Sequence, residues 1–253
     1  DVLGSRGLGD VYKRQLIIRH GDPDYTIDSL TEKGKTEAEL LSDRISKMDI
    51  KKFYVSPLGR AKATADYTLK KMNRKAEECN WLREFEAPII GTDGNKKITW
   101  DWLPAEWTVE EDYYRRDLWH TTSVMQDGNV ISEAERVYRG LDEIIASHGY
   151  EREGNCYKAV DPNCDTIVLF CHFGVECVML GHLLGISPMV LWHGTCALPT
   201  SVTTLATEER RKGTAYFRML SFGDISHLYA AGEEPSFSGR FCEMYDNINE
   251  RHD

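Results

Sequence analysis

The feature that most constrains this chain is a short apolar run, at residues 16–21, that ends abruptly in an arginine, a histidine and a glycine. Such a run predicts a buried strand, and the charged pair then falls at its carboxyl end. Open α/β sheets place their ligand sites at that edge, and the glycine lets the backbone turn there. The run therefore indicates that the histidine lies at a ligand site. Taken alone, a strand end with a solvated Arg-His pair is the plainer interpretation.

Length and charge limit the classes of partner. The chain has 253 residues and a formal net charge of -10, which suits one sizeable domain and argues against nucleic acid or an anionic membrane as the main partner. The longest apolar stretch, residues 166–192, is interrupted by His172, Glu176, His182 and Pro188, so we predict no transmembrane helix. An anionic substrate would need a local basic pocket.

The cysteines point to a reducing compartment. There are seven, and none form a C-x-x-C pair, which is typical of reduced thiols in a cytoplasmic protein. Cys156 and Cys164 flank a polar loop and are candidates for pairing only in an oxidising setting. Further on, several metal-ligand types fall within a short span, but their spacing matches no closed zinc pattern. These are Cys171, His172, Cys177, His182, His193 and Cys196. We expect buried thiols and no metal site.

The domain boundaries are expected as follows. Residues 1–15 resemble the translation of a sequencing-library adaptor, so we treat them as a non-native leader and exclude them from the fold. A genuine flexible leader is the alternative. Residues 16–245 are expected to form one domain with an insertion at about 86–129, followed by a tail at 246–253.

The order of predicted elements is that of a parallel sheet. A strand at 16–19 precedes a helix capped by Thr31, and a strand at 53–55 precedes a helix opened by Ser56 and Pro57. After the insertion we expect a helix at 131–148, a polar loop to 163, a strand at 166–171, a helix at 175–184 and strands at 201–207 and 215–221. The aromatic insertion is expected to be partly helical, as a lid or a satellite core. Its many acids oppose a nucleic-acid stacking surface.

Four separated segments place chemically suited residues near strand carboxyl ends. They are Arg19-His20-Gly21, Ser56-Pro57-Leu58-Gly59-Arg60-Ala61, Leu82-Arg83-Glu84 and Cys171-His172-Phe173-Gly174. In a parallel sheet these ends meet at one edge. We therefore expect the four segments to form one site.

This set resembles the histidine phosphatase superfamily, with its phosphoglycerate mutase-like fold. The matching residues also include Thr64 and Ala65, and the resemblance spans residues 16–228. It implies an α/β fold with a mainly parallel open sheet, helices on both faces and a capping insertion. It further implies a phosphatase that needs no metal or cofactor and acts on a phosphorylated small molecule.

Phosphoryl transfer demands charge stabilisation and positioning. Arg19 and Arg60 suit the equatorial phosphoryl oxygens, because a guanidinium can bind two of them at once. The resemblance makes His20 the nucleophile, which forms a phosphohistidine that water then hydrolyses. Two guanidinium neighbours would also keep that imidazole neutral.

The remaining predicted roles are those of an acid and of phosphate ligands. His172 is expected to donate to the phosphoryl oxygens. Glu84 is expected to protonate the leaving oxygen and then to activate water, with Glu86 as the rival. Thr26 and Thr64 are candidates for secondary phosphate contacts, and each could equally cap a loop or a helix.

Two other functions stay open. In a mutase the phosphohistidine would return its phosphoryl group to the substrate, and the pair Arg115 and Arg116 would hold the other anionic end of that substrate. The second alternative is a catalytically silent module that binds phosphorylated partners. The presence of all five core residues opposes it.

Overall fold

The computed structural model describes residues 13–91, 94–239 and 244–247. Its centre is an eight-stranded sheet in the order β5-β4-β10-β1-β11-β12-β9-β8. The strands are β1 (Arg14–Arg19), β4 (Lys52–Val55), β5 (Ala76–Glu78), β8 (Tyr150–Glu153), β9 (Cys156–Ala159), β10 (Thr166–Cys171), β11 (Val202–Arg211) and β12 (Thr214–Asp224). The neighbours β5, β4, β10 and β1 are parallel, and the strands from β11 to β8 continue the sheet antiparallel. The predicted α/β class with a parallel core is confirmed.

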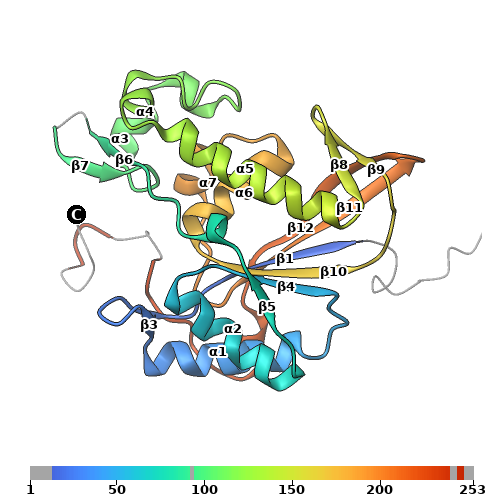
Figure 1. Cartoon of the computed structure of the whole chain (residues 1–253). Helices are drawn as coiled ribbons and strands as arrows, with labels where there is room; N and C mark the ends of the chain where they lie inside the picture. The colour runs from blue at the N-terminus through green and yellow to red at the C-terminus, as the bar shows by residue number, and fades with distance from the viewer. Residues whose placement is uncertain (1–12, 92–93, 240–243, 248–253) are drawn as a thin grey trace, which may run out of the picture.

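Helices cover both faces of the sheet (Figure 1). One face carries α1 (Glu32–Ile45) and α2 (Gly59–Met72), and the other carries α5 (Val130–Ser147), α6 (Phe173–Leu184) and α7 (Pro188–Gly194). The short α8 (Ser226–Ala230) contacts α1. Thr31 caps α1 as predicted, because its side chain accepts from the Gly34 N–H. This caps one of the unpaired amides of the first turn.

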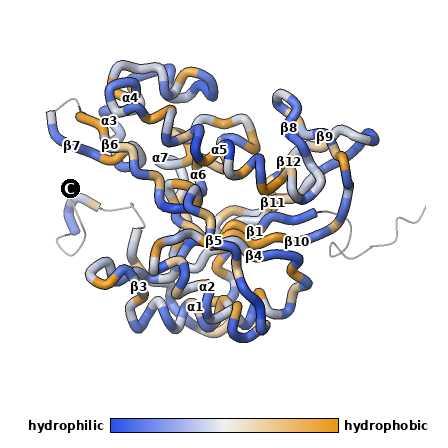
Figure 2. The backbone as a smooth tube through the Cα atoms, viewed as in Figure 1, coloured by the Kyte–Doolittle hydropathy of each residue, from blue (hydrophilic) through white to orange (hydrophobic). Residues whose placement is uncertain are grey.

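Two hydrophobic cores follow from the alternation of side chains along the strands. Ile17 and Leu169 face α5 and α6, whereas Leu16 and Val168 face α1 and α2. Strands buried on both sides read as unbroken apolar runs, and Figure 2 shows β10 as an apolar segment in the middle of the molecule. These central strands can therefore be predicted from the sequence alone.

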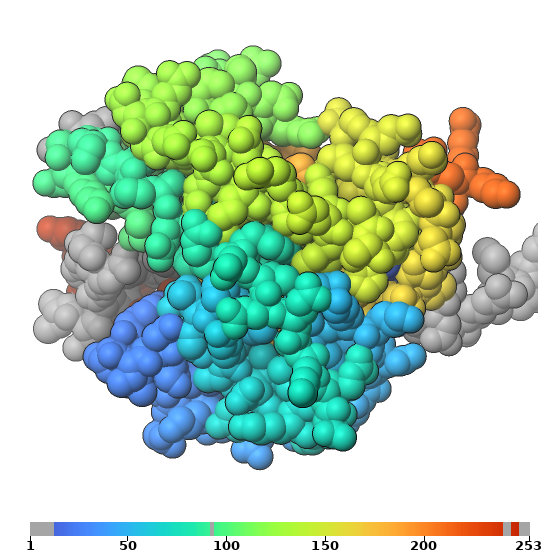
Figure 3. Space-filling view, in the orientation of Figure 1, coloured from blue at the N-terminus to red at the C-terminus, as the bar shows by residue number. Residues whose placement is uncertain are grey.

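The insertion contributes to the larger core. It contains η1 (Asn80–Leu82) at its entrance, the hairpin β6 (Pro88–Ile90) and β7 (Lys96–Ile98), α3 (Pro104–Trp107), η2 (Glu111–Tyr114) and α4 (Ser123–Asp127). Trp102, Trp107, Tyr113 and Trp119 are buried in the same cluster as α5 and α6. In Figure 3 this green segment and α5 form a continuous surface. Rings that are buried in this core cannot stack on bases. They belong to the larger core itself, so the prediction of a separate satellite core is wrong for these four residues.

Several predicted boundaries are wrong. Strand β1 begins at Arg14, so two residues of the excluded leader belong to the sheet, where Arg14 and Gln15 align with Thr166 and Ile167 of β10. The polar segment before residue 163 is a β8–β9 hairpin that pairs with β12. Helix α6 starts at Phe173, two residues earlier than predicted. Most of the predicted tail, including residues 248–253, lies outside the described residues.

The start of α2 also differs from the prediction. The helix begins at Gly59, so Ser56 does not cap it and Pro57 precedes its first turn. Asp28, which lies in the loop after β2 (Pro23–Asp24), instead accepts the Gly59 N–H at 2.6 Å. The short partner of β2 is β3 (Ser29–Leu30). Ser56 is therefore free to serve the site described next.

Candidate active site

Three loops leave the parallel strands side by side. The His20 N–H donates to the Cys171 carbonyl at 3.0 Å, and the Ser56 N–H donates to the Phe170 carbonyl at 2.9 Å. These bonds keep the carboxyl ends of β1, β4 and β10 next to one another at the same edge of the sheet. As a result the rings of His20 and His172, 152 positions apart in the sequence, have centroids 5.1 Å apart at an interplanar angle of 56°.

The hydrogen bond of His20 sets its tautomer. Its Nδ1 lies 2.7 Å from the Gly21 carbonyl oxygen. A carbonyl can only accept, so Nδ1 carries the proton and Nε2 keeps its lone pair. Burial, then the positive charge of Arg19 and more weakly that of Arg60, holds the pKa of His20 well below its usual value. The imidazole is therefore neutral over most of the accessible pH range, with a nucleophilic Nε2.

His172 has a complementary arrangement. Its Nε2 lies 2.7 Å from Ser56 Oγ, which also accepts the Leu58 N–H at 3.3 Å. The serine hydrogen finds an acceptor if it points at Nε2, and Nδ1 then carries the ring proton. Nδ1 is buried without a partner among the described residues. Burial and the neighbouring His20 lower the pKa of His172 well below its usual value. The neutral ring thus offers an unused donor.

The two arginines are held by different means. Arg19 is buried and its Nη1 donates to the carbonyls of Ala197 and, at 3.5 Å, Gly239. Arg60 Nη1 pairs with Asp28 Oδ1 at 2.8 Å. The Nε of each arginine is buried without a partner in the described part of the chain. Both guanidiniums act electrostatically on His20, which puts their charge at one site.

Glu84 lies at the amino end of α6. Its carboxyl oxygens accept from the N–H groups of Phe85 at 2.7 Å, Val175 at 3.0 Å and Gly174 at 3.4 Å. A helix amino terminus favours a negative charge, yet burial outweighs these bonds and raises the pKa of Glu84. Position 174 must be small, because a β-carbon there would lie 2.7 Å from Glu84 Oε1. A carboxyl with a raised pKa can deliver a proton.

Other predicted residues lie elsewhere. Glu86 is exposed, and its backbone N–H reaches Glu133 at 3.5 Å. Thr26 is exposed on its loop, where its hydroxyl donates to Asp24 at 2.6 Å. Thr64 Oγ1 donates to the Arg60 carbonyl at 2.8 Å and accepts the Gly21 N–H at 2.9 Å. Thr64 therefore supports the loop that carries His20, and phosphate contacts from either threonine stay predictions.

Arg116 lies by the far end of α6. A β-carbon on Gly185, the residue that caps α6 at its carboxyl end, would lie 3.4 Å from Arg116 Nη1. The helix has 12 residues, and at ~1.5 Å per residue its two ends are separated by about 18 Å. The amino end carries His172 and Glu84. Arg116 is thus about one helix length from the two histidines.

The sequence analysis assigned no role in the site to three residues of this region. Asp28 orients Arg60, Ser56 orients His172, and Glu176 is buried in the first turn of α6. A glutamate in an otherwise apolar helical run was the only available signal for Glu176. The partners of Ser56 and Asp28 are distant in the sequence, so no local pattern indicated them.

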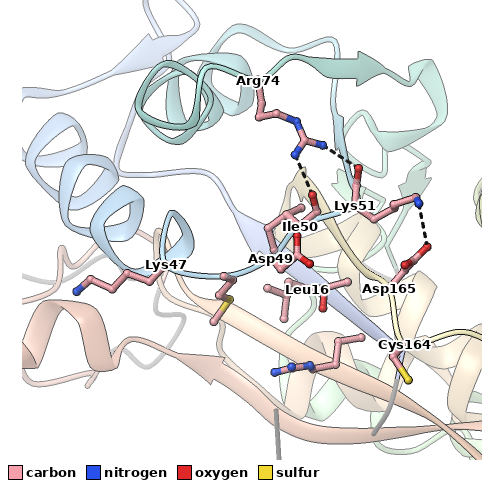
Figure 4. Close-up of a pocket in the computed structure, with 11 residues that line it drawn as sticks. Leu16, Lys47, Asp49, Ile50, Lys51, Arg74, Cys164 and Asp165 are labelled. Carbon is pink, nitrogen blue, oxygen red and sulfur yellow. Dashed lines mark hydrogen bonds and ion pairs between the residues drawn. The ribbon is translucent and has the colours of Figure 1, made fainter. Parts of the chain in front are cut away.

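The cleft in Figure 4 is not this site. It has a volume of about 840 Å³ and lies at the amino ends of β1, β4 and β10, between residues such as Leu16, Ile50 and Thr166. Two of its basic side chains are engaged: Arg74 donates to the Ile50 and Lys51 carbonyls, and Lys51 pairs with Asp165 at 3.8 Å. These interactions tie the strand ends together, on the opposite edge from His20.

Two histidines among the metal-ligand types noted in the sequence have other partners. His182 binds Asp142 at 2.9 Å, and His193 accepts the Trp102 N–H at 3.2 Å. Among residues 13–91, 94–239 and 244–247, no group of three or more His, Cys, Asp or Glu side chains could hold a metal ion. Cys156 and Cys164 are free thiols. Over the same described ranges, no helix is long and apolar enough to cross a membrane.

The close approach of α1 to the loop that follows His20 gives a stability prediction. A β-carbon on Gly34 would lie 2.3 Å from the Asp22 carbonyl oxygen, two residues after His20. Gly34→Ala is therefore expected to cost ~2 kcal/mol or more of unfolding free energy in urea titrations, despite alanine's better helix propensity. The control is Gly194→Ala, where no heavy atom lies within 4 Å of the new β-carbon. Similar losses in both variants would contradict the prediction.

Comparisons with known proteins agree with the fold described above. The solved structures that match include a phosphoserine phosphatase mutant from Entamoeba histolytica in complex with phosphoserine (19% identity, TM-score 0.57, covering 85% of this chain and 99% of that one). A mycobacterial glucosyl-3-phosphoglycerate phosphatase (18%, TM-score 0.55, 84% and 99%) and a phosphoglycerate mutase from Bacillus anthracis (17%, TM-score 0.59, 89% and 99%) also match. At these identities the likeness shows the fold alone.

The family is shown by the sequence comparison. No curated protein is similar enough in sequence to count as a match. The family model of the histidine phosphatase superfamily (branch 1) matches residues 15–218, well over half of the chain. That range contains Arg19, His20, Arg60, Glu84 and His172. The chain is therefore a member of the histidine phosphatase superfamily, whose solved relatives named above are phosphatases and a mutase.

Proposed function

We propose that this protein hydrolyses a phosphate monoester of a small molecule through a phosphohistidine on His20. The observation that carries the proposal is the bond from His20 Nδ1 to the Gly21 carbonyl, which leaves Nε2 unprotonated beside two guanidiniums. Names of the matching structures refer to phosphoserine and to glucosyl-3-phosphoglycerate, which supports a phosphorylated metabolite as the substrate class. Cys156 and Cys164, which were candidates for pairing only in an oxidising setting, are free thiols, and this supports a cytoplasmic location.

The reaction has two balanced steps. In the first, the Nε2 lone pair forms a bond to phosphorus while the ester P–O bond breaks, and the leaving oxygen takes the proton of Glu84. Arg19, Arg60 and the Nδ1–H of His172 stabilise the charge on the phosphoryl oxygens. In the second step, water attacks phosphorus, gives a proton to the Glu84 carboxylate, and the P–N bond breaks. Glu84 regains its proton and His20 its lone pair.

The direct test is capture of the intermediate. During turnover of p-nitrophenyl phosphate, an alkaline quench followed by intact-mass measurement should show one phosphoryl adduct, and digestion should place it on His20. The adduct should disappear under acid, because a phosphoramidate bond is acid-labile. A phosphoryl group found on another residue would contradict the proposal. Phosphopeptide binding without turnover would instead identify a silent module.

The pH dependence follows from the two shifted groups. His20 must be neutral and its pKa lies well below the usual value, so the acid limb of kcat/KM is expected well below about pH 6.5. Glu84 must be protonated and its pKa is raised, so activity should fall as the pH rises through that pKa. A pH-rate profile with its acid limb near that of a free imidazole would contradict this assignment.

The position of Arg116 opposes the mutase alternative for that member of the Arg115 and Arg116 pair. That arginine lies by Gly185, at the opposite end of α6 from His172, and cannot hold a substrate carboxylate beside His20. Arg116→Ala is therefore expected to change phosphate release by less than about twofold, whereas Arg60→Ala should lower kcat/KM by about 10²-fold or more. Conversion of 3- to 2-phosphoglycerate without net phosphate release, lost in Arg116→Ala, would identify a mutase.

A further inference from the structure

One buried carboxyl group joins two parts of the chain that carry the site. Glu37 lies on α1 and is fully buried. Its Oε2 accepts the Asp22 N–H at 3.1 Å, and its Oε1 accepts the Ser236 N–H at 2.8 Å. Burying a carboxyl group costs stability, and an apolar side chain of similar size would fill the same space without that cost. The two bonds of Glu37 therefore call for an explanation other than packing.

The first partner of Glu37 belongs to the loop that follows His20. Asp22 is two residues after His20. Its Oδ2 accepts the Thr31 hydroxyl at 2.6 Å, and its carbonyl accepts the Thr31 N–H at 3.1 Å. Gly34 packs directly against the same carbonyl, because a β-carbon at that position would overlap it. These contacts hold the loop on the amino end of α1, whether or not Glu37 contributes its own bond.

The second partner leads to Arg19. Ser236 belongs to the 233–239 segment, which follows α8 along the chain. The end of this segment lies on the guanidinium, because the Gly239 carbonyl accepts from Arg19 Nη1 at 3.5 Å. The contact is close, since a β-carbon on Gly239 would overlap Arg19 Nη2. The position of the 233–239 segment therefore limits where the guanidinium of Arg19 can lie.

We propose that Glu37 is a positioning residue, which sets the place of Arg19 relative to His20 through the 233–239 segment. One of its oxygens is bonded to the loop after His20, and the other to the segment that ends on Arg19. A carboxylate suits this task because both of its oxygens accept hydrogen bonds. Reacting groups must be placed to within about 0.5 Å for efficient transfer. This inference rests on the proposed function, which makes His20 the nucleophile and assigns Arg19 to the phosphoryl oxygens.

The first test is Glu37→Met, which keeps the length of the side chain and removes both acceptors. Well below the unfolding midpoint, we expect kcat for p-nitrophenyl phosphate to fall about tenfold or more, and the dissociation constant for sulfate to rise about threefold or more. A purely structural role would shift the unfolding midpoint and leave both constants of the folded protein unchanged. Glu39→Gln, which changes an exposed carboxyl group on the same helix, should match the wild type in both measurements.

A second pair of variants tests the end of the segment. Gly239 and Gly232 have nearly the same left-handed backbone, with φ of +69° and +70°, so alanine is strained at both positions. At position 239 the new β-carbon would overlap Arg19, whereas at position 232 no heavy atom of the described residues lies within 4 Å of it. Gly239→Ala is therefore expected to lower kcat about tenfold or more, and Gly232→Ala to stay within about twofold of the wild type.

The two tests act on opposite ends of the same connection, so each is decisive if the other variant does not fold. Wild-type kcat in folded Glu37→Met, or in folded Gly239→Ala, would overturn the inference. The proposed function would still stand in that case if the wild type releases phosphate in a His20-dependent manner. Absence of His20-dependent release would instead contradict the proposed function itself.

Discussion

His20→Ala is expected to lower kcat/KM for p-nitrophenyl phosphate by about 10⁴-fold or more, because the variant has no atom that can take the phosphoryl group. The rest of the site should persist. Arg19 is held by the carbonyls of Ala197 and Gly239, and His172 by Ser56, none of which involve His20. Steady-state release of p-nitrophenolate measures the effect.

Two measurements would show that the loss of activity does not come from unfolding of the variant. The variant should keep the unfolding midpoint of the wild type within a few degrees and should still bind sulfate. His120→Ala provides a matched control, because that half-buried histidine lies in the insertion beside Trp119, and its activity should stay within about twofold of the wild type. A fully folded His20→Ala protein with more than a few per cent of wild-type activity would rule out the phosphohistidine route.

Glu84→Gln is expected to lower kcat by about 10²- to 10⁴-fold for an alkyl phosphate, whose leaving oxygen needs a proton. The loss should be much smaller in the first step with p-nitrophenyl phosphate, because nitrophenolate leaves without protonation. The amide can keep the bonds from the N–H groups of Val175 and Phe85 through its oxygen, so the geometry is preserved. The alkaline limb of the pH profile should also disappear.

The control for this variant is Glu86→Gln, two residues along the same segment. Glu86 is exposed, so its neutral variant should hydrolyse both substrates at the wild-type rate. An equal loss for alkyl and aryl substrates in Glu84→Gln would show that Glu84 orients the site without transferring a proton. A large loss in Glu86→Gln would transfer the acid role to that residue.

Local sequence patterns predicted the elements with the strongest signals. The strand expected at 166–171 is β10 with the same bounds, because six consecutive residues are buried between two helical layers. The β8–β9 hairpin was not predicted, because its sequence has only a weak alternation of apolar and polar residues. Tyr150 and Tyr157 are the only buried residues of its two strands. Ser56 looked like a helix cap, but its bond to His172 joins residues 116 positions apart. No local pattern contains such a contact.

The sequence by itself determined the parallel core and the order of its strands and helices along the chain. It also placed the motif residues at the ends of the strands. These features depend on the pattern of side chains over a few neighbouring residues. Only the tertiary structure decided which nitrogen of His20 keeps its lone pair. It also decided that Glu84 lies at the amino end of α6 while Glu86 is exposed to solvent. In the same way it placed Arg116 at the opposite end of that helix. These facts depend on backbone groups and burial contributed by distant segments, and such contacts leave no trace in local composition.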